Sequence, residues 1–109
     1  MARFASSTAP LAADGEYSTG ILLSDVYDRV TGSVFADQAG TVYIEQSGDG
    51  ENWDVVSGSG EGTAVTADTG AAISEELVLP YYRVRFENGE IEQTEFRIFV
   101  RSTAAGNKY

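Results

Sequence analysis

The sequence predicts an all-β protein, an antiparallel β-sandwich that is jelly-roll-like, with about eight strands and an extended N-terminal arm. Three observations support this prediction. Short runs of β-branched and aromatic residues alternate apolar with polar positions, and clusters of Gly, Asp and Asn recur about every 8 to 12 residues. No segment sustains the period of a helix. A small closed barrel is the alternative architecture.

The composition fits a single folded domain. The chain has 109 residues, of which 42% are hydrophobic and 11% aromatic, and this is enough apolar surface for a modest core. We divide the chain into an extended N-terminal arm over residues 1–14, a β-sandwich domain over residues 15–101 and a polar C-terminal tail over residues 102–109. A frayed terminus is the alternative to a docking arm, because the first segment is small, polar and without period.

The strand pattern recurs along the whole predicted domain. The predicted strands cover residues 16–23, 27–36, 41–47, 53–56, 63–67, 71–79, 81–87 and 91–101. Gly32 shares a face with apolar neighbours, and its missing side chain indicates a bulge or the close approach of another backbone. Pro80 lacks a donor N–H, so we expect it at a strand start or an edge. Trp53 is expected to anchor the core.

Two turn sequences predict hairpins. Residues 37–40, Asp-Gln-Ala-Gly, join the second predicted strand to the third, with Gly40 available for a positive φ. Asn88 and Gly89 join the last two strands, and both residues tolerate the positive φ angles of a type I′ turn. We therefore expect the last two strands to pair with each other.

Alternation assigns the inward positions of the longer strands. They are Val30, Val34, Ala36, Val42, Ile44, Tyr82, Val84, Phe86, Phe96, Ile98 and Val100. Their neighbours in the sequence are expected to point outward.

Charge and composition exclude several classes of function. The chain has 17 acidic and 7 basic residues and a net charge of −10, so we expect neither nucleic acid nor membrane as a partner. Residues 1–13 lack the apolar run of a secretory signal, and we expect a soluble protein.

Because the chain has no Cys and no His, we expect no enzyme, no metal and no cofactor. The acidity suits a basic partner or simple solubility.

Two acidic groupings have chemical alternatives. Residues 49–54 place acids near a turn, but they lack the spacing of a calcium loop, and an ordinary Asp-Gly turn is favoured. A second grouping could supply a pair of glycosidase carboxylates, although a solvated surface is favoured. It comprises Glu75, Glu76, Glu87, Glu90, Glu92 and Glu95.

Most of the basic residues fall on the last two predicted strands. The outward positions there are Tyr81, Arg83, Arg85, Arg97, Phe99 and Arg101. In a hairpin they would form one basic ribbon. Its arginines would either pair with acids inside the fold, such as Glu92 and Glu95, or bind an acidic patch of another subunit.

One long stretch resembles a known group of proteins. Residues 27–54 contain a strand, the Asp-Gln-Ala-Gly turn, a strand Thr-x-Tyr-x-Glu-Gln-Ser and a turn Asp-Gly-x-Asn-Trp-Asp. Residues 80–85 add a strand Pro-Tyr-x-Arg-Val-Arg. Together these segments resemble small β-sandwich virion proteins of tailed phages and prophages, of the head-decoration or fibre type, over about half of the chain.

The resemblance implies a non-enzymatic phage virion structural protein, most simply a capsid decoration (cement) protein that binds the assembled head and stabilises it. The expected partners are the major capsid protein or other virion subunits, and a homo-oligomer, first a trimer, is expected on a symmetric shell. The protein would lie on the phage head surface after assembly from the host cytoplasm. The expected contacts are the arginine-bearing strands and an arm set of Arg3, Phe4, Pro10 and Leu11.

A second hypothesis is a carbohydrate-binding module of a phage fibre or a cell-surface protein. Exposed aromatic rings can stack on sugar rings, and Tyr43, Trp53 and Tyr81 would form the platform. Packing of these rings in the core or on the sheet is the simpler interpretation.

Overall fold

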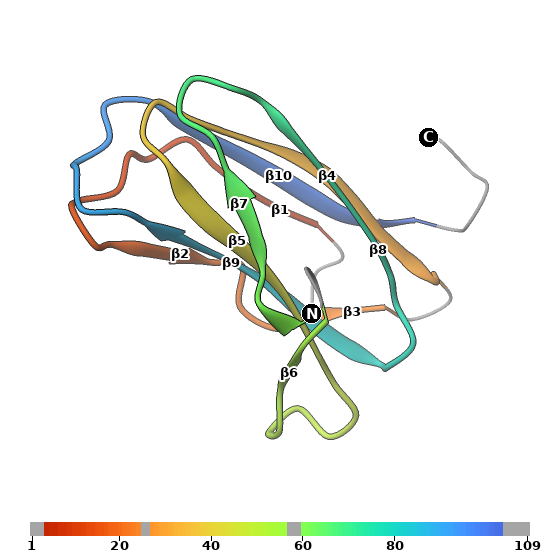
Figure 1. Ribbon diagram of the computed structural model, residues 1–109. Coiled ribbons are helices and arrows are strands. Elements are labelled where there is room, and N and C mark those ends of the chain that lie inside the picture. The colour runs from red at the N-terminus through yellow and green to blue at the C-terminus, as the bar shows by residue number, and fades with distance from the viewer. Residues whose placement is uncertain (1–3, 25–26, 57–59, 104–109) are drawn as a thin grey trace.

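The structure is a computed structural model that describes residues 4–24, 27–56 and 60–103. Two antiparallel sheets pack face to face, which confirms the predicted all-β sandwich, and the described residues form ten strands (Figure 1). Sheet A has the order β1 (Phe4–Ser7), β10 (Phe96–Thr103), β4 (Arg29–Ala36) and β8 (Ala71–Glu76). No helix in the described ranges is long and apolar enough to cross a membrane.

Sheet B is built around two long central strands. Its main order is β2 (Glu16–Ser18), β9 (Tyr81–Asn88), β5 (Gly40–Ser47) and β6 (Asp54–Val55). In addition, β3 (Leu22–Leu23) pairs with β9, and β7 (Thr63–Val65) pairs with β5. Each edge of sheet B therefore consists of two short strands in place of one long strand.

The first predicted strand of sheet B is broken in two. Its halves, β2 and β3, lie along the same edge of β9, but the register shifts by one residue between Ser18↔Arg85 and Leu22↔Tyr82. Gly20, with a φ of 74°, lies at the break. Because glycine has no Cβ, it can adopt this conformation and accommodate the extra residue of a bulge.

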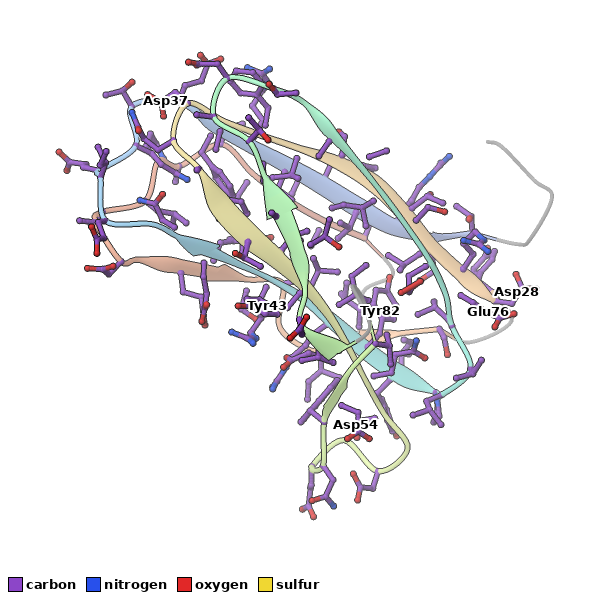
Figure 2. All side chains as sticks on the ribbon, viewed as in Figure 1. Asp28, Asp37, Tyr43, Asp54, Glu76 and Tyr82 are labelled. Atoms are coloured by element: carbon purple, nitrogen blue, oxygen red, sulfur yellow. The ribbon has the colours of Figure 1, made fainter. Side chains whose placement is uncertain are left out.

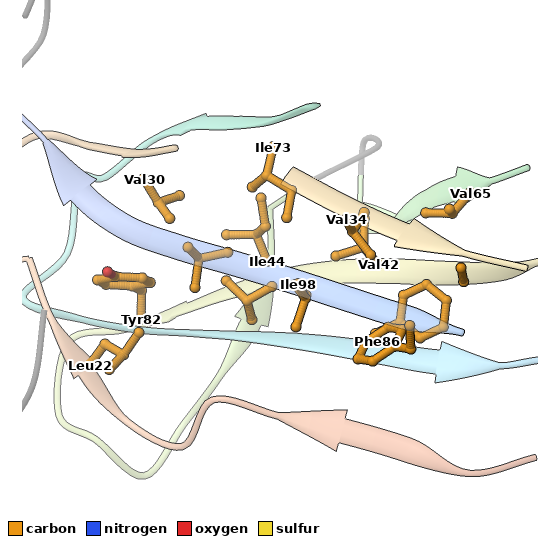
Figure 3. Packing of buried hydrophobic residues seen from close by; sticks show 14 of the residues in the cluster. Leu22, Val30, Val34, Val42, Ile44, Val65, Ile73, Tyr82, Phe86 and Ile98 are labelled. Carbon is orange, nitrogen blue, oxygen red and sulfur yellow. The ribbon is translucent and has the colours of Figure 1, made fainter. Parts of the chain in front are cut away.

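The alternation of apolar residues correctly predicted the core. All the inward positions that the sequence assigns are at most 4% exposed, and several, including Val30, Tyr82 and Phe86, are fully buried (Figure 3). Leu22, Val65, Ile73 and Leu77 complete the buried cluster. Trp53 does not belong to this cluster, so the prediction that it anchors the core was wrong.

Both predicted hairpins were wrong, because each turn leads from one sheet to the other. The strand before Asp37 is β4 of sheet A and the strand after it is β5 of sheet B, while β9 and β10 also lie in different sheets. Gly40 and Gly89 do not have a positive φ. Gly40 is instead a ladder residue of β5, where a Cβ would lie 2.5 Å from the carbonyl oxygen of Glu87.

The two sheet-crossing loops hold each other in place at one end of the sandwich. The Asp37 carboxylate accepts hydrogen bonds from the backbone N–H of Thr94 at 3.1 Å and of Glu95 at 3.2 Å. In return, the N–H of Asp37 donates to the carbonyl of Glu95, and the N–H of Gly89 donates to the carbonyl of Ala39. The two loops thereby satisfy each other's polar groups.

Part of the segment expected to be an arm lies along the sandwich. Phe4–Ser7 forms β1 and pairs with β10. Farther on, the Leu11 N–H donates to the buried side-chain oxygen of Gln93 at 2.8 Å, and the Gln93 N–H donates to the Leu11 carbonyl. Of the segment expected to be the polar tail, Ser102 and Thr103 end β10, and residues 104–109 lie outside the described part.

Gly32 marks the close approach of another backbone, as the sequence predicted. It pairs with Val100 of β10 on one side and with Ile73 of β8 on the other, and a Cβ at this position would lie 1.9 Å from the carbonyl oxygen of Phe99. No side chain can be accommodated there unless the two strands move apart.

We predict that Gly32→Ala lowers the free energy of unfolding by at least about 2 kcal/mol, because the added methyl group overpacks a central strand pair. Urea denaturation measures this change. Gly48→Ala is the control, since no atom lies within 4 Å of a Cβ at Gly48, and this variant should be close to neutral. Equal losses in the two variants would contradict the steric explanation.

Candidate functional site

The predicted basic ribbon does not exist, because its two strands lie in different sheets. Tyr81, Arg83 and Arg85 alternate with the buried residues of β9 and therefore lie on the outer surface of sheet B, called face B here. The other three predicted ribbon residues, Arg97, Phe99 and Arg101, lie on the outer surface of sheet A, called face A. The two groups occupy opposite sides of the sandwich.

The predicted arm contacts are also separated. Phe4 lies on face A and is 61% exposed. Leu11 is half-buried against the core, whereas Pro10 is exposed in the connection between β1 and β2. Arg3 lies outside the described residues.

Face B has a buried carboxylate at its centre. The side chain of Glu45 on β5 is only 8% exposed, and its Oε1 accepts hydrogen bonds from the Nε of Arg83 and, at 3.1 Å, from the Nε of Arg85. Arg85 also reaches Glu16 at 2.8 Å and Glu87 at 3.3 Å through Nη1. Cross-strand pairing of β5 with β9 brings these groups together, since Glu45 lies directly opposite Arg83.

Aromatic rings complete the network on face B. The guanidinium carbon of Arg83 lies 4.3 Å from the centre of the Trp53 ring, and that of Arg85 lies 4.6 Å from the centre of the Tyr43 ring. Figure 2 marks the position of Tyr43. With Tyr81 on the same face, the three residues of the predicted sugar platform share one surface. The Arg83 guanidinium covers one face of the Trp53 ring, and the Arg85 guanidinium covers one face of the Tyr43 ring. A sugar that stacked on either of these ring faces would compete with the arginine for it.

The charges around Glu45 determine its protonation. Burial would raise the pKa of its carboxyl group, but the hydrogen bonds and positive charges of Arg83 and Arg85 outweigh this effect and hold the pKa below its ordinary value. Glu45 is therefore ionised near neutral pH. The network uses the charge of both arginines within the fold.

Face A has a different character, because its aromatic residues are exposed. Phe4 of β1 stacks on Phe99 of β10 with 6.4 Å between the ring centres and 27° between the ring planes, and Phe99 is 43% exposed. Beside them lies a hollow of about 320 Å³ lined by Phe4, Tyr27, Phe99, Arg101 and Ser102. Singly exposed apolar residues are ordinary, but a stacked pair beside a hollow is typical of a binding surface.

Face A carries three arginines, Arg29, Arg97 and Arg101, which differ in the partners that they contact. Arg97 pairs with Glu95 and lies over the Phe35 ring at 4.4 Å, and Arg29 donates to the Ser74 hydroxyl at 2.8 Å. No acid of the described residues lies within ion-pair distance of Arg101. Arg101 therefore places at the rim of the hollow a positive charge that no acid of the described ranges pairs with.

The acidic groupings considered from the sequence are engaged locally or spread apart. In the predicted turn, the Asp49 carboxylate accepts hydrogen bonds from the backbone N–H groups of Asn52 and Glu51, each at 2.8 Å, and these bonds hold its pKa far below the ordinary value. The carboxylates of the second grouping are spread over β8 of sheet A, β9 of sheet B and the connection between β9 and β10. Among the described residues, no group of three or more Asp and Glu side chains is placed to hold a metal ion.

Sequence reasoning missed Glu45, and it did not place Tyr27 at the hollow of face A. The importance of Glu45 depends on the pairing of β5 with β9, and no local pattern specifies that pairing. Tyr27 precedes β4 and lines the hollow only because β10 pairs with β4. The aromatic pair of face A depends in the same way on the register of β1 against β10, in which Phe4 lies opposite Arg101.

We predict that Glu45→Gln lowers the free energy of unfolding near neutral pH by about 1–3 kcal/mol, because two partly buried arginines lose their shared carboxylate. Since the folded state lowers the pKa of Glu45, its contribution is present above the unfolded value near 4.5 and is lost as the pH falls through the folded value. The stability of the variant should therefore fall less than that of the natural chain on acidification.

Denaturation at neutral and at acid pH measures the difference between the two chains. Glu51→Gln is the matched control, because the Glu51 side chain is exposed and has no ion pair within the described ranges. If Glu45→Gln shows the same acid dependence as the natural chain, the network has no role in stability.

Comparison with solved structures supports the topology. The crystal structure of the PBSX exported protein XepA superimposes with a TM-score of 0.84 and 26% sequence identity, covering 97% of this chain and 38% of that chain. The crystal structure of the Yersinia pseudotuberculosis-derived mitogen matches with a TM-score of 0.54 and 11% identity over 100% of this chain and 92% of that one. The second likeness concerns the fold only.

Sequence comparison identifies relatives in Bacillus subtilis (strain 168). The uncharacterized protein YqxG is 31% identical over 94 residues, covering 85% of this chain and 30% of YqxG. The phage-like element PBSX protein XepA is 33% identical over 81 residues, covering 72% of this chain and 26% of XepA. The chain thus spans well under half of either relative, and the expected kinship with prophage proteins is confirmed at this level. Residues 2–103 match the family described as the uncharacterised protein YqxG N-terminal domain, and the chain belongs to this family.

Proposed function

We propose that this chain is a non-enzymatic structural protein of a phage-like element, and that it acts as a decoration protein that binds an assembled head. Its kinship with XepA, a protein of the phage-like element PBSX, supports the phage context. The single observation that carries the binding role is face A, where exposed aromatic rings and Arg101 surround a hollow.

The chemistry of face A specifies the kind of partner surface that it fits. In a chain of net charge −10, Arg101 is a local positive charge without an acidic partner among the described residues. The stacked rings of Phe4 and Phe99 offer apolar area next to it. A partner that places an apolar side chain in the hollow and a carboxylate beside Arg101 would satisfy both features.

Binding of this kind stabilises a shell by mass action. A protein that binds the assembled capsid but not its free subunits shifts the equilibrium toward the assembled state. In this proposal the major capsid protein is the partner, and the bound chain lies on the head surface. Face B would then point away from the shell, because it lies on the other side of the sandwich.

A second candidate function is carbohydrate binding at face B. The observation in its favour is that Tyr43, Trp53 and Tyr81 share this face. A sugar stacking on the Trp53 ring would displace the Arg83 guanidinium or occupy the opposite ring face. Tryptophan fluorescence titrated with a panel of glycans tests it directly, since the chain has one Trp.

We predict that Phe4→Ser and Arg101→Gln each weaken binding to capsids of the parent phage by at least about tenfold, because each removes one part of a central contact. Co-sedimentation of the purified protein with these capsids measures the affinity. Ile91→Ser is the matched control, because Ile91 is 62% exposed, as Phe4 is 61% exposed, but lies outside face A.

Three outcomes are informative. Saturable binding that is lost in both face A variants and kept in the control would support the decoration role. Binding that is unchanged in all three variants would place the contact elsewhere on the molecule. No capsid binding together with a glycan-dependent change in Trp53 fluorescence would favour the second candidate.

A further inference from the structure

β8 is the longest edge strand in the described part of the chain. It has six residues, whereas the other edge strands have four (β1), three (β2 and β7) or two (β3 and β6). Proteins usually keep edge strands short or protect them with lysine, proline or a bulge, because an open edge can pair with another chain. β8 has no lysine, proline or bulge, and its register with β4 is unbroken from Val34↔Ala71 to Arg29↔Glu76. Its charged residues, Glu75 and Glu76, lie at its C-terminal end and leave residues 71–74 uncharged.

Two hydrogen bonds establish which backbone groups of β8 are open. The Leu77 N–H donates to the Asp28 carbonyl at 2.7 Å, so residue 77 faces β4 and, by alternation, residues 71, 73 and 75 do as well. The Glu76 carbonyl accepts instead from the Gln46 side chain at 2.8 Å, which shows that residue 76 faces away from β4. Ala72 and Ser74 therefore present their N–H and C=O groups at the open edge.

The surroundings of this edge suit a second strand. The side chains of Ala72 and Ser74 are small and exposed on face A, and Ile73 between them is buried toward the core. Next to β8, between the two sheets, lies a hollow of about 240 Å³ with a mixed lining, apolar at Val42, Ile44 and Ile73 and polar at Thr63, Ser74 and Glu75.

We propose that β8 pairs antiparallel with β8 of a second copy of this chain, about a two-fold axis at Ile73. In this register Ala72 of each copy lies opposite Ser74 of the other, and their open groups form four hydrogen bonds. The small outward side chains of Ala72 and Ser74 meet without a clash. The strand is therefore complementary to itself, as a two-fold interface requires.

The same register separates the acids of the two strands. Glu75 lies opposite Ala71 of the second copy, and Glu76 lies opposite Gly70, so no carboxylate faces another directly. Each copy still carries a net charge of −10, and the repulsion between two such molecules opposes association. Salt screens this repulsion, so higher salt should strengthen the dimer.

The pairing is independent of capsid binding. β4 lies between β8 and β10, and β10 lines the hollow of face A, so the hollow stays open in the dimer. A two-fold axis perpendicular to the shared sheet also leaves face A of both copies on the same side. Failure of one proposal therefore does not entail failure of the other.

Cysteine cross-linking tests the register, because the natural chain has no Cys. In a hydrogen-bonded antiparallel pair the Cα atoms are about 5.5 Å apart, which suits a disulfide. A mixture of Ala72→Cys and Ser74→Cys should therefore yield a covalent dimer under copper-phenanthroline oxidation. Either variant on its own should not, because identical residues would lie about 8 Å apart. Equal cross-linking in all three samples would overturn the register.

Sedimentation equilibrium of the full chain tests the association itself. We expect a reversible dimer whose Kd falls as salt rises, and we expect Ala72→Pro to raise the Kd by at least about tenfold, because it removes one edge N–H from each copy. Ala72→Val keeps that N–H and is the control, and circular dichroism checks that both variants fold. A monomer at every concentration and salt, a trimer, or a dimer insensitive to Ala72→Pro would overturn the proposal.

Discussion

The connection over residues 89–95 carries the chain from sheet B to sheet A, and much of the surface chemistry depends on this crossing. It separates β9 from β10, two consecutive strands that both carry arginines. The crossing is held by hydrogen bonds to the neighbouring loop at Asp37, so it is part of the packed fold. As a result, each face of the sandwich has its own set of charges.

The two faces use these charges in different ways. On face B, Glu45 accepts from Arg83 and Arg85, and the rings of Trp53 and Tyr43 lie against the guanidinium groups. An arginine that is already paired must lose that partner before it can bind another, so this network favours stability over recognition. On face A, Arg101 forms no ion pair within the described part of the chain. It can therefore bind a partner's carboxylate without first breaking an existing pair, as Arg83 and Arg85 would have to do.

The sequence specified the period of the strands much better than their partners. Val42, Ile44, Tyr82 and Val84 could be assigned to the core because alternation is a local property. Asn88 and Gly89 predicted a hairpin, but the same two residues lie where the chain leaves sheet B for sheet A. At this corner the Asn88 side chain donates a hydrogen bond to the carbonyl of Ala12. Gly32 was predictable because a glycine within a strand has few structural explanations.

The candidate site was less predictable, because its residues come from distant strands. Phe4 and Phe99 meet only through the register of β1 against β10, and Glu45 meets Arg83 only through the pairing of β5 with β9. The sequence correctly indicated that Arg83, Arg85 and Arg101 point outward. It could not indicate that two of them are neutralised within the fold and that the third lacks an acidic partner in the described residues.

The same crossing topology has a consequence for how the chain folds. Among the described connections, few join neighbouring strands of one sheet, the turn between β5 and β6 being the clearest local hairpin. Most pairings, such as β10 with β4, join segments far apart in the sequence and require closure of long loops before any contact forms. Chains dominated by such non-local pairing fold in milliseconds to seconds. During that time strands that lack their partners expose open edges, so folding has to compete with association between unfinished molecules.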